Sequence, residues 1–252
     1  MTAAFFLVDP AALVTYVGGT VVVDGPEGRH AATVKRIGVG EPVLVGDGAG
    51  RVVEGHVAAV VGRDVVEVEV TAYAEHPVPV PRVVVVQALP KGERGELAVE
   101  LLTEVGADVV VPWAASRSIA VWRGEKAQRG TEKWRVTARE AAKQSRRPFV
   151  PEVRPLASTA DVATLLRATV DVGGVGLLLH EAAARRLTDV ALPHSGDVVL
   201  VVGPEGGIAG DELEIFADTG AHAVRLGPSV MRTSTAGAVA ASLVLSSSGR
   251  WA

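Results

Sequence analysis

The chain has 252 residues, of which 48% are hydrophobic and 21% are charged, and its net charge is −4 at pH 7. This composition is typical of a globular protein and excludes a disordered chain. Cysteine is absent, which excludes disulfides, thiolate metal sites, iron–sulfur clusters and a cysteine nucleophile. No apolar run reaches the ~18 residues of a spanning helix, and the N-terminal segment does not resemble a signal peptide. We therefore expect a cytoplasmic protein with no membrane association.

The first part of the chain is rich in valine and has short alternating patterns. Strands are expected at 41–45, 51–57 and 65–70, with a turn at residues 47–50 between the first two. These strands predict a small β-barrel or sandwich. Prolines at alternate positions then predict an extended linker at 74–81. The expected domains are therefore 1–73, the linker 74–81, and 82–252.

The pattern changes after this linker to continuous apolar segments separated by amphipathic ones. The expected strands are 82–89, 108–112, 175–179, 198–202 and 223–226. The expected helices are 93–105, with Gly106 as its stop, 126–144, a helix capped by Ser158 or Thr159 and ending at Arg167, 211–219 and 236–247. Strands without alternation, separated by helices, predict a mainly parallel α/β sheet covered on both faces.

Charge is unevenly distributed along the chain. Residues 116–147 carry ten basic and three acidic side chains, although the whole chain is acidic. Such a segment is either a surface for a polyanion or a solvated helix face. Charge alone does not decide between the two interpretations.

Three strand ends carry unusual loops: LLLHE at 177–181, VVGPEGG at 201–207 and LGPSVMRTSTA at 226–236. Ligands of α/β sheets bind outside the carboxyl ends of the strands, where glycines let the backbone approach them closely. None of the loops has the GxGxxG, GxxxxGK[ST] or GxSxG pattern. Any one of these glycines could simply form a turn, but three successive loops indicate a shared ligand pocket.

In this order, the loops resemble those of the SPOUT superfamily, and more narrowly the bacterial 16S ribosomal RNA uridine-N3 methyltransferases. The resemblance covers nearly the whole chain. Its most specific pieces are VVGPEGGIAGDEL and LGPSVMRTSTA. Further matches are Arg29-His30, 34–36, 39–41 and 47–50 in the N-terminal part, and 91–94, 103–106, 116–118 and 141–147 beyond it.

The resemblance implies an α/β methyltransferase domain with a deep trefoil knot, preceded by a PUA-like RNA-binding β-barrel. It also implies a homodimer that binds S-adenosylmethionine among the three loops and methylates N3 of a uridine in 16S ribosomal RNA of the small ribosomal subunit. The cofactor-binding residues implied are Leu179, His180, Glu181, Val202, Gly203, Pro204, Glu205, Gly206, Gly207, Leu226, Gly227, Pro228, Val230, Met231, Arg232 and Thr233.

Two of these residues are also the candidates for catalysis. Arg232 stays charged and can stabilise negative charge on the uracil oxygens, but it cannot serve as a base. Glu205 can accept the N3 proton, or it can pair with backbone N–H groups at a helix start. His180 can contribute to catalysis, although a backbone contact in the pocket wall suits it better.

Unpaired RNA must be held if N3, on the pairing edge of the base, is to react. The candidate RNA-binding residues are Arg29, Lys35, Arg36, Lys91, Arg94, Arg117, Gln144, Ser145, Arg146 and Arg147. Gln144 and Ser145 can contact a base or cap a helix. Trp122 and Trp134 can stack on bases or pack in the core.

The sequence departs from the family pattern at three positions. Ser229 replaces a larger basic or polar residue, Ser234 an acidic one, and Leu101 stands near the usual position of a lysine. Alternatives are a SPOUT enzyme for another position such as a ribose 2′-hydroxyl, a non-catalytic assembly factor, or an unrelated nucleotide-binding enzyme. No metal is implied, because His and acidic residues lack ligand spacing.

Overall fold

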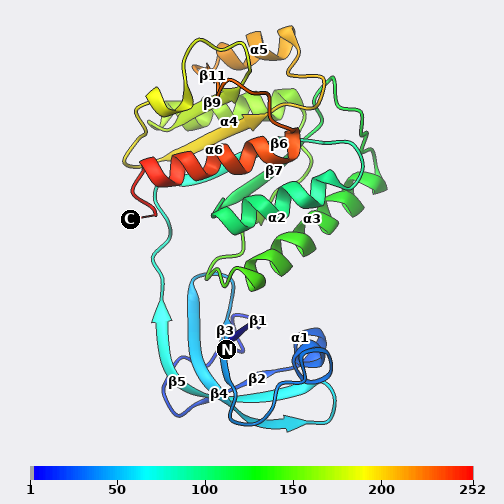
Figure 1. Ribbon diagram of the computed structural model, residues 1–252, viewed down its shortest axis with the longest axis vertical. Coiled ribbons are helices and arrows are strands. Elements are labelled where there is room, and N and C mark those ends of the chain that lie inside the picture. Colours follow the sequence, from blue (N-terminus) through cyan, green and yellow to red (C-terminus); the bar gives the residue numbers. More distant parts are fainter. Residues whose placement is uncertain (1–2, 252) are drawn as a thin grey trace. The chain divides into compact units, whose positions relative to one another are not determined.

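The computed structural model describes residues 3–251 (Figure 1). The chain forms two compact units, one of Met1–Val78 with Ala142–Val150 and the other of Pro79–Ala141 with Pro151–Ala252. Within the described residues, no helix is both long enough and apolar enough to cross a membrane.

The first unit is built on a five-stranded sheet with the strand order β1-β3-β4-β5-β2. Its strands are β1 (Ala4–Leu7), β2 (Thr20–Val23), β3 (Pro42–Gly46), β4 (Arg51–Val61) and β5 (Val65–Glu75). The short helices α1 (Gly25–Arg29) and η1 (His30–Lys35) follow β2. Alternate residues of β2 and β5 are buried, as the valine alternation predicts.

The expected hairpin is confirmed, because β3 and β4 pair antiparallel up to Gly46 and Val52. The Asp47 carboxylate organises the turn. It accepts hydrogen bonds from the backbone N–H groups of Ala49 at 2.8 Å and Arg51 at 3.1 Å, and from Nε of Arg51 at 2.7 Å.

The segment 142–150 belongs to this unit through contacts with the same turn. The N–H of Gly50 donates to the carbonyl of Pro148 at 3.0 Å, and the N–H of Val150 donates to the carbonyl of Gly48 at 2.9 Å. In the same unit, Nζ of Lys143 lies 2.7 Å from a carboxylate oxygen of Glu27, and both side chains are largely buried.

The second unit contains a six-stranded sheet with the order β11-β9-β10-β6-β7-β8. Its strands are β6 (Arg82–Ala88), β7 (Val109–Trp113), β8 (Glu152–Val153), β9 (Val175–Leu179), β10 (Asp197–Val202) and β11 (His222–Val224). Every neighbouring pair is parallel, which confirms the expected parallel sheet.

Helices cover both faces of this sheet (Figure 1). On one face, α2 (Arg94–Val105), α3 (Glu125–Gln144) and α6 (Thr233–Ser247) pack around Trp134 and Leu102. On the other, α4 (Thr159–Asp171) and α5 (Gly210–Ala217) pack around Leu166 and Phe216. A short helical turn, η2 (Leu187–Asp189), follows β9.

Helix ends agree with the expected signals in two places, whereas α4 runs on to Asp171 instead of ending at Arg167 and the start of α6 also differs. Gly106, with φ of 114°, ends α2, and Ser158 caps α4 in a reciprocal bond with Asp161. Helix α6 begins at Thr233 instead of 236, because the carbonyl of Arg232 accepts the N–H groups of Thr235 and Ala236. Strand β5 extends through Ala74 and Glu75, which we expected in the linker, because both pair with β4.

The chain beyond α6 is fastened to the sheet. The guanidinium of Arg250 forms a two-pronged ion pair with Asp108, which precedes β7, and donates to the carbonyl of Pro81 at 3.2 Å. The same carboxylate also accepts a hydrogen bond from the N–H of Val83 at 2.8 Å. The end of the described chain is therefore tied to the starts of β6 and β7.

The turn at Asp47 predicts an acid-sensitive first unit. Burial alone would raise the pKa of Asp47, but the hydrogen bonds from Ala49 and Arg51 outweigh it, so the pKa of this carboxyl lies below its ordinary value. Its charge therefore stabilises the fold at neutral pH, and this contribution is lost as the pH falls below ~4 through the folded-state pKa.

We expect Asp47→Asn to lower the free energy of unfolding at pH 7 by about 1–3 kcal/mol. Urea unfolding of the full chain at several pH values measures this, and the difference from the unmodified protein should shrink toward pH 3. A difference that stays constant down to pH 3 would contradict the charged role of Asp47.

Candidate functional site

The three loops at 177–181, 201–207 and 226–236 meet at the carboxyl edge of the six-stranded sheet. Leu179 ends β9 and Val202 ends β10, and the third loop leads from β11 to α6. Together they line a cavity of about 490 Å³. Its lining consists of Arg94, Arg117, Leu179, His180, Glu181, Val202, Gly203, Pro204, Glu205, Gly206, Gly207, Ile208, Val230, Met231, Arg232, Thr233 and Ala236. We call it the loop cavity.

A smaller space of about 80 Å³ shares six of these lining residues and adds Arg225, Leu226, Gly227 and Ser229. The structure therefore brings together the residues expected to bind the cofactor, with one difference. Pro228 lies in the third loop but lines neither space. The neighbouring Ser229 and Val230 occupy the edge of the smaller one instead.

The structural requirement for glycine differs between positions of these loops. A Cβ at Gly203 would lie 2.8 Å from Cγ1 of Ile208, and Gly207 has φ of +71°, so the turn itself requires both. A Cβ at Gly227 would meet no atom within 4 Å. Packing does not require glycine there, and its backbone is open to a ligand.

His180 is engaged locally in the first loop. Its N–H donates to the carbonyl of Val224 at 2.9 Å, and its Nδ1 accepts from the N–H of Ala182 at 3.2 Å. The ring therefore stabilises the turn after β9, which supports the expected place of His180 in the cavity wall.

Arg232 is the last residue before α6, and its side chain is exposed at the loop cavity. Among residues 3–251, its guanidinium has no hydrogen-bond or ion-pair partner. Ser234, two positions on, is 3% exposed. The cationic group is thus available to a ligand, whereas Ser234 lies inside the helix packing.

Glu205 links the second loop to the segment after β6. Its Oε1 accepts a hydrogen bond from the N–H of Lys91 at 3.1 Å. Lys91, Arg94 and Glu205 also line a further space of about 600 Å³. The carboxylate therefore pairs with a backbone N–H, which is one of the two roles expected for it. This N–H belongs to Lys91, however, and not to a helix start.

Two buried polar residues support the loops and were missed from the sequence. Gln87, at the end of β6, is fully buried, and its Nε2 donates to the carbonyl of Thr233 at 3.3 Å and to that of Ala88 at 3.1 Å. It therefore connects the first strand of the unit with the start of α6. A single amide within the apolar run VVVVQAL was the available signal.

Glu212 is the second of these residues. It is 2% exposed and accepts hydrogen bonds from the N–H of Ser116 at 2.8 Å, the hydroxyl of Thr159 at 3.0 Å and the N–H of Ala209 at 3.1 Å. Beside Ser116, the guanidinium of Arg117 donates to the carbonyl of Gly206 at 3.2 Å. One carboxylate therefore fixes the segment that covers the second loop.

The candidate RNA-binding residues fall in both units. Lys91, Arg94 and Arg117 lie in the second unit, and the last two line the loop cavity. The first unit holds Arg29 at the end of α1, Lys35 in η1, Arg36 after it, Gln144 at the end of α3, and Ser145, Arg146 and Arg147 beyond it.

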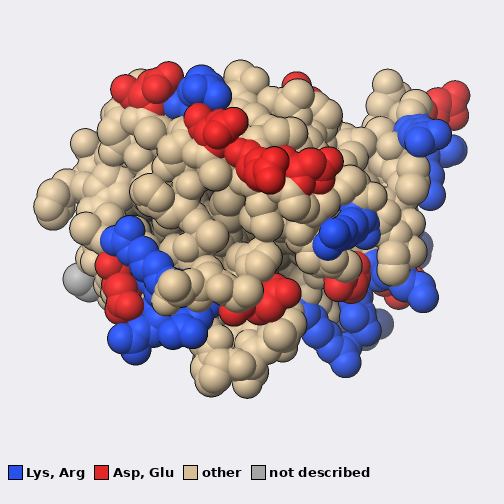
Figure 2. Space-filling view, turned by 90° about the horizontal axis from the view of Figure 1, so that it is seen from above, with Lys and Arg blue, Asp and Glu red and all other residues tan. Residues whose placement is uncertain are grey.

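Part of the basic segment serves the fold. Lys143 is 7% exposed and pairs with Glu27, and Lys133 pairs with Glu96 at 2.9 Å. The face in Figure 2 carries separate groups of basic and acidic side chains instead of a continuous basic surface. In the described part of the chain, no three His or acidic side chains are grouped as metal ligands.

Comparisons with known proteins agree with this arrangement. A family model described as an RNA methyltransferase domain matches residues 76–245, and one described as an RNA methyltransferase PUA domain matches residues 23–71. The ribosomal RNA small subunit methyltransferase E of Mycobacterium bovis is 47% identical over 251 residues, which are 100% of this chain and 94% of the relative. The Bacillus subtilis protein of that name is 28% identical and covers 86% of each chain.

Solved structures share the fold. A ribosomal RNA small subunit methyltransferase E from Neisseria gonorrhoeae, bound to S-adenosyl methionine, matches with a TM-score of 0.84 and 24% identity over 97% of this chain and 98% of that one. A putative methyltransferase from Legionella pneumophila, also with that cofactor, matches with a TM-score of 0.82 and 24% identity over 98% of each chain.

The contacts of Glu212 generate a prediction. Glu212→Gln places an amide NH2 against donors, and we expect it to lower the free energy of unfolding by about 1–3 kcal/mol. Glu214→Gln, at an exposed position of the same helix, is the control and should change it by less than about 0.5 kcal/mol. Urea unfolding of the full chain measures both. Equal effects of the two substitutions would show that Glu212 does not fix this segment.

Proposed function

Because the chain belongs to the RNA methyltransferase family, we propose that it transfers a methyl group from S-adenosylmethionine to N3 of one uridine in 16S ribosomal RNA. The observation that carries the proposal is the meeting of three loops in one cavity, which Arg232 lines with a guanidinium that has no partner among residues 3–251. The identity of 47% to a ribosomal RNA small subunit methyltransferase over the whole chain supports it.

The loop cavity suits this cofactor. Its lining joins glycines and apolar side chains to several charged ones, and cofactor pockets likewise combine an apolar wall with a few polar groups. The open space beside Gly227 leaves room for a flat ring against the backbone, and Leu179 and Leu226 supply apolar contact. When bound, S-adenosylmethionine supplies an electrophilic methyl group on sulfur.

The chain's own residues then act on the uridine. Loss of the N3 proton leaves negative charge on N3 and the uracil oxygens, and this charge is consumed as N3 takes the methyl group and the methyl–sulfur bond breaks. Arg232 lies where it can stabilise that charge, because its guanidinium is exposed at the cavity and stays protonated. Among the carboxylates of the motif, Glu205 is the candidate to accept the proton, and for this its hydrogen bond from the N–H of Lys91 has to break.

The uridine has to be unpaired, because N3 lies on the pairing edge of the base. We propose that Lys91, Arg94 and Arg117 hold RNA phosphates beside the cavity. Arg29, Lys35, Arg36, Arg146 and Arg147, together with Gln144 and Ser145, hold RNA on the first unit. Phosphate contacts of this kind make binding sensitive to salt.

The finer architecture follows the family resemblance. Residues 1–75 with 142–150 form a PUA-like barrel that binds RNA, 76–81 form a linker, and the rest of 82–252 forms a SPOUT domain whose C-terminal segment passes through a loop as a trefoil knot. The active form is a homodimer in the cytoplasm, and its substrate is the assembled small subunit.

The test is methyl transfer from labelled S-adenosylmethionine to small subunits that lack the modification, followed by reverse transcription. Incorporation with a stop at one uridine is expected, because an N3 methyl blocks pairing. Incorporation without a stop would point instead to a ribose or to another position off the pairing edge. Cofactor binding without incorporation would favour an assembly factor.

Arg232 carries a separate prediction. We expect Arg232→Gln to lower kcat by about 100-fold or more, as loss of a group that stabilises transition-state charge does, with little change in cofactor affinity. Single-turnover methylation measures the first quantity, and the shift of Tm by the cofactor measures the second. Equal losses in turnover and cofactor affinity would assign Arg232 to cofactor binding alone.

A further inference from the structure

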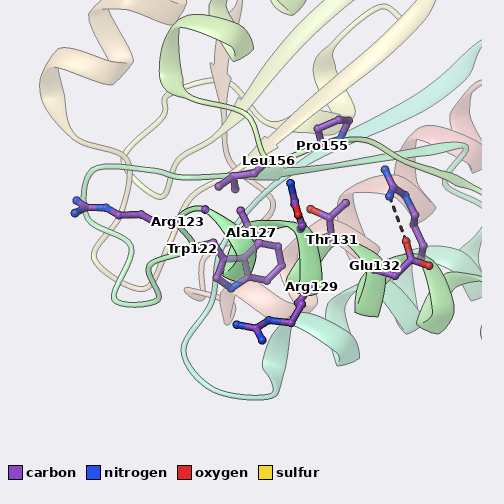
Figure 3. Close-up of a pocket in the computed structure, with 11 residues that line it drawn as sticks. Trp122, Arg123, Ala127, Arg129, Thr131, Glu132, Pro155 and Leu156 are labelled. Carbon is purple, nitrogen blue, oxygen red and sulfur yellow. Dashed lines mark hydrogen bonds and ion pairs between the residues drawn. The ribbon is translucent and has the colours of Figure 1, made fainter.

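A second cavity of the methyltransferase unit has no part in the site described above. Its volume is about 720 Å³, and it lies between the start of α3 and the segment after β8 (Figure 3). Trp122, Ala127, Pro155 and Leu156 supply an apolar lining, and Gln128 and Thr131 supply polar groups. We call it the tryptophan cavity.

Part of the wall of the tryptophan cavity comes from the same edge of the sheet as the loop cavity. Pro155 and Leu156 follow β8, and β8 runs parallel to β7, β6 and β10. The chain joins the two cavities directly, because Arg117 contacts Gly206 and Trp122 is five residues further on. The Cα atoms of Arg117 and Trp122 are therefore at most about 18 Å apart, a distance that a few nucleotides of RNA can span.

Trp122 and Trp134 have different environments. Trp134 is 1% exposed and belongs to the core. The half-buried Trp122 packs edge-on against it, with ring centroids 5.3 Å apart at 71°. A Cβ at Gly130 would lie 2.7 Å from Cε2 and Cζ2 of Trp122, so the absence of a side chain at Gly130 lets the indole lie flat on α3. The indole is thus held rigidly in the cavity wall.

Thr131 adds a polar group that the fold leaves unused. Its side chain is 4% exposed and lines the cavity, and Figure 3 shows it beside the apolar group of Trp122, Ala127 and Leu156. Within residues 3–251, its hydroxyl has no hydrogen-bond partner. The hydroxyl oxygen is not fully enclosed, so it is accessible at the cavity surface to a ligand or to water.

Cationic groups surround this lining. Arg135 is engaged by Glu132 at 3.3 Å, but Arg123 and Arg129 extend from the rim (Figure 3). Arg129 lies 4.0 Å from Glu125, with both side chains more than three-quarters exposed, so this pair is weak. The tryptophan cavity thus combines a fixed aromatic ring, hydrogen-bonding groups and free positive charge, which is the set that binds unpaired nucleotides.

We propose that the tryptophan cavity binds an unpaired nucleotide of the RNA substrate that flanks the target uridine. The base stacks on Trp122 and hydrogen-bonds to Thr131 or Gln128, while Arg123 and Arg129 contact the adjoining phosphates. This rests on the proposed function for the identity of the RNA. It assigns a substrate-positioning role to the start of α3, distant in sequence from the three loops.

The test uses the full chain with S-adenosylmethionine and a fluorescently labelled single-stranded RNA of ten nucleotides containing 4-thiouridine. Trp122→Leu should weaken RNA binding by about fivefold or more, the loss expected for one stacked base. Thr131→Val should weaken it by a smaller factor. Irradiation should cross-link the RNA to the peptide that contains residues 122–135.

Charge variants provide an independent arm. Arg123→Gln and Arg129→Gln should each reduce the slope of log affinity against log salt by up to ~0.7, the value for one phosphate of a single strand. Arg167→Gln is the matched control, since it removes the same charge from an exposed position of α4 on the opposite face of the sheet. It should leave the slope unchanged.

Unchanged affinity of Trp122→Leu, or the same slope for Arg123→Gln, Arg129→Gln and Arg167→Gln, would overturn the proposal. If Trp122→Leu fails to fold, as melting would show, Thr131→Val and the arginine variants decide it. Methyl transfer to small subunits is measured in parallel. If the protein without substitutions transfers no methyl group, the proposed function is refuted. The comparison of RNA affinities between the variants would still decide whether the tryptophan cavity holds a nucleotide.

Discussion

The parallel pairing of β6 with β10 is the constraint on which the rest of the second unit depends. Six registered residue pairs join the strands, from Arg82 with Asp197 to Gln87 with Val202, although 115 positions separate the partners. At the amino end, the guanidinium of Arg82 binds the Asp197 carboxylate through two hydrogen bonds of 3.0 and 2.7 Å. At the carboxyl end, the same register puts Gln87 beside the last residue before the second loop. Gln87, which holds the start of α6, therefore lies beside Val202, the last residue of the strand that leads into the GPEGG turn.

Much of the second unit was predictable because its strands are buried on both faces. Such strands read as continuous apolar runs whose ends are marked by Gly, Pro or Asp, as at 82–89 and 198–202. Strand β8 has two residues, Glu152 and Val153, too few for any pattern. The return of 142–150 to the first unit was also beyond prediction. Its hydrogen bonds to Gly48 and Gly50 join residues about a hundred positions apart, and no local sequence pattern predicts such contacts.

For the candidate site, spacing indicated the loops but not what holds them. Glycine patterns after strands located the cavity walls, since the carboxyl ends of parallel strands share an edge. Gln87 and Glu212 act through the interior, and each reads in sequence as an ordinary polar residue of a strand or a helix start. The basic segment shows the same limit. Arginine and lysine look alike in a charge count, yet Lys143 is buried against Glu27 while Arg123 and Arg129 extend from the rim of a cavity.

Helix α6 is held at both of its ends. Gln87 binds the carbonyl of its first residue, Thr233, and the residues beyond it end in the ion pair of Arg250 with Asp108. A helix with a single anchor can slide along its axis and take up a change in the length of the preceding loop. With two anchors α6 has a fixed register, so the span from β11 to Arg232 has a set contour length. An extra residue in that span has to bulge out of the loop, whose residues 228–232 are exposed, and a deletion has to draw the loop tight across the loop cavity. A shorter loop in a related chain would therefore reduce the volume left for the ligand, whereas a longer one can expand into solvent.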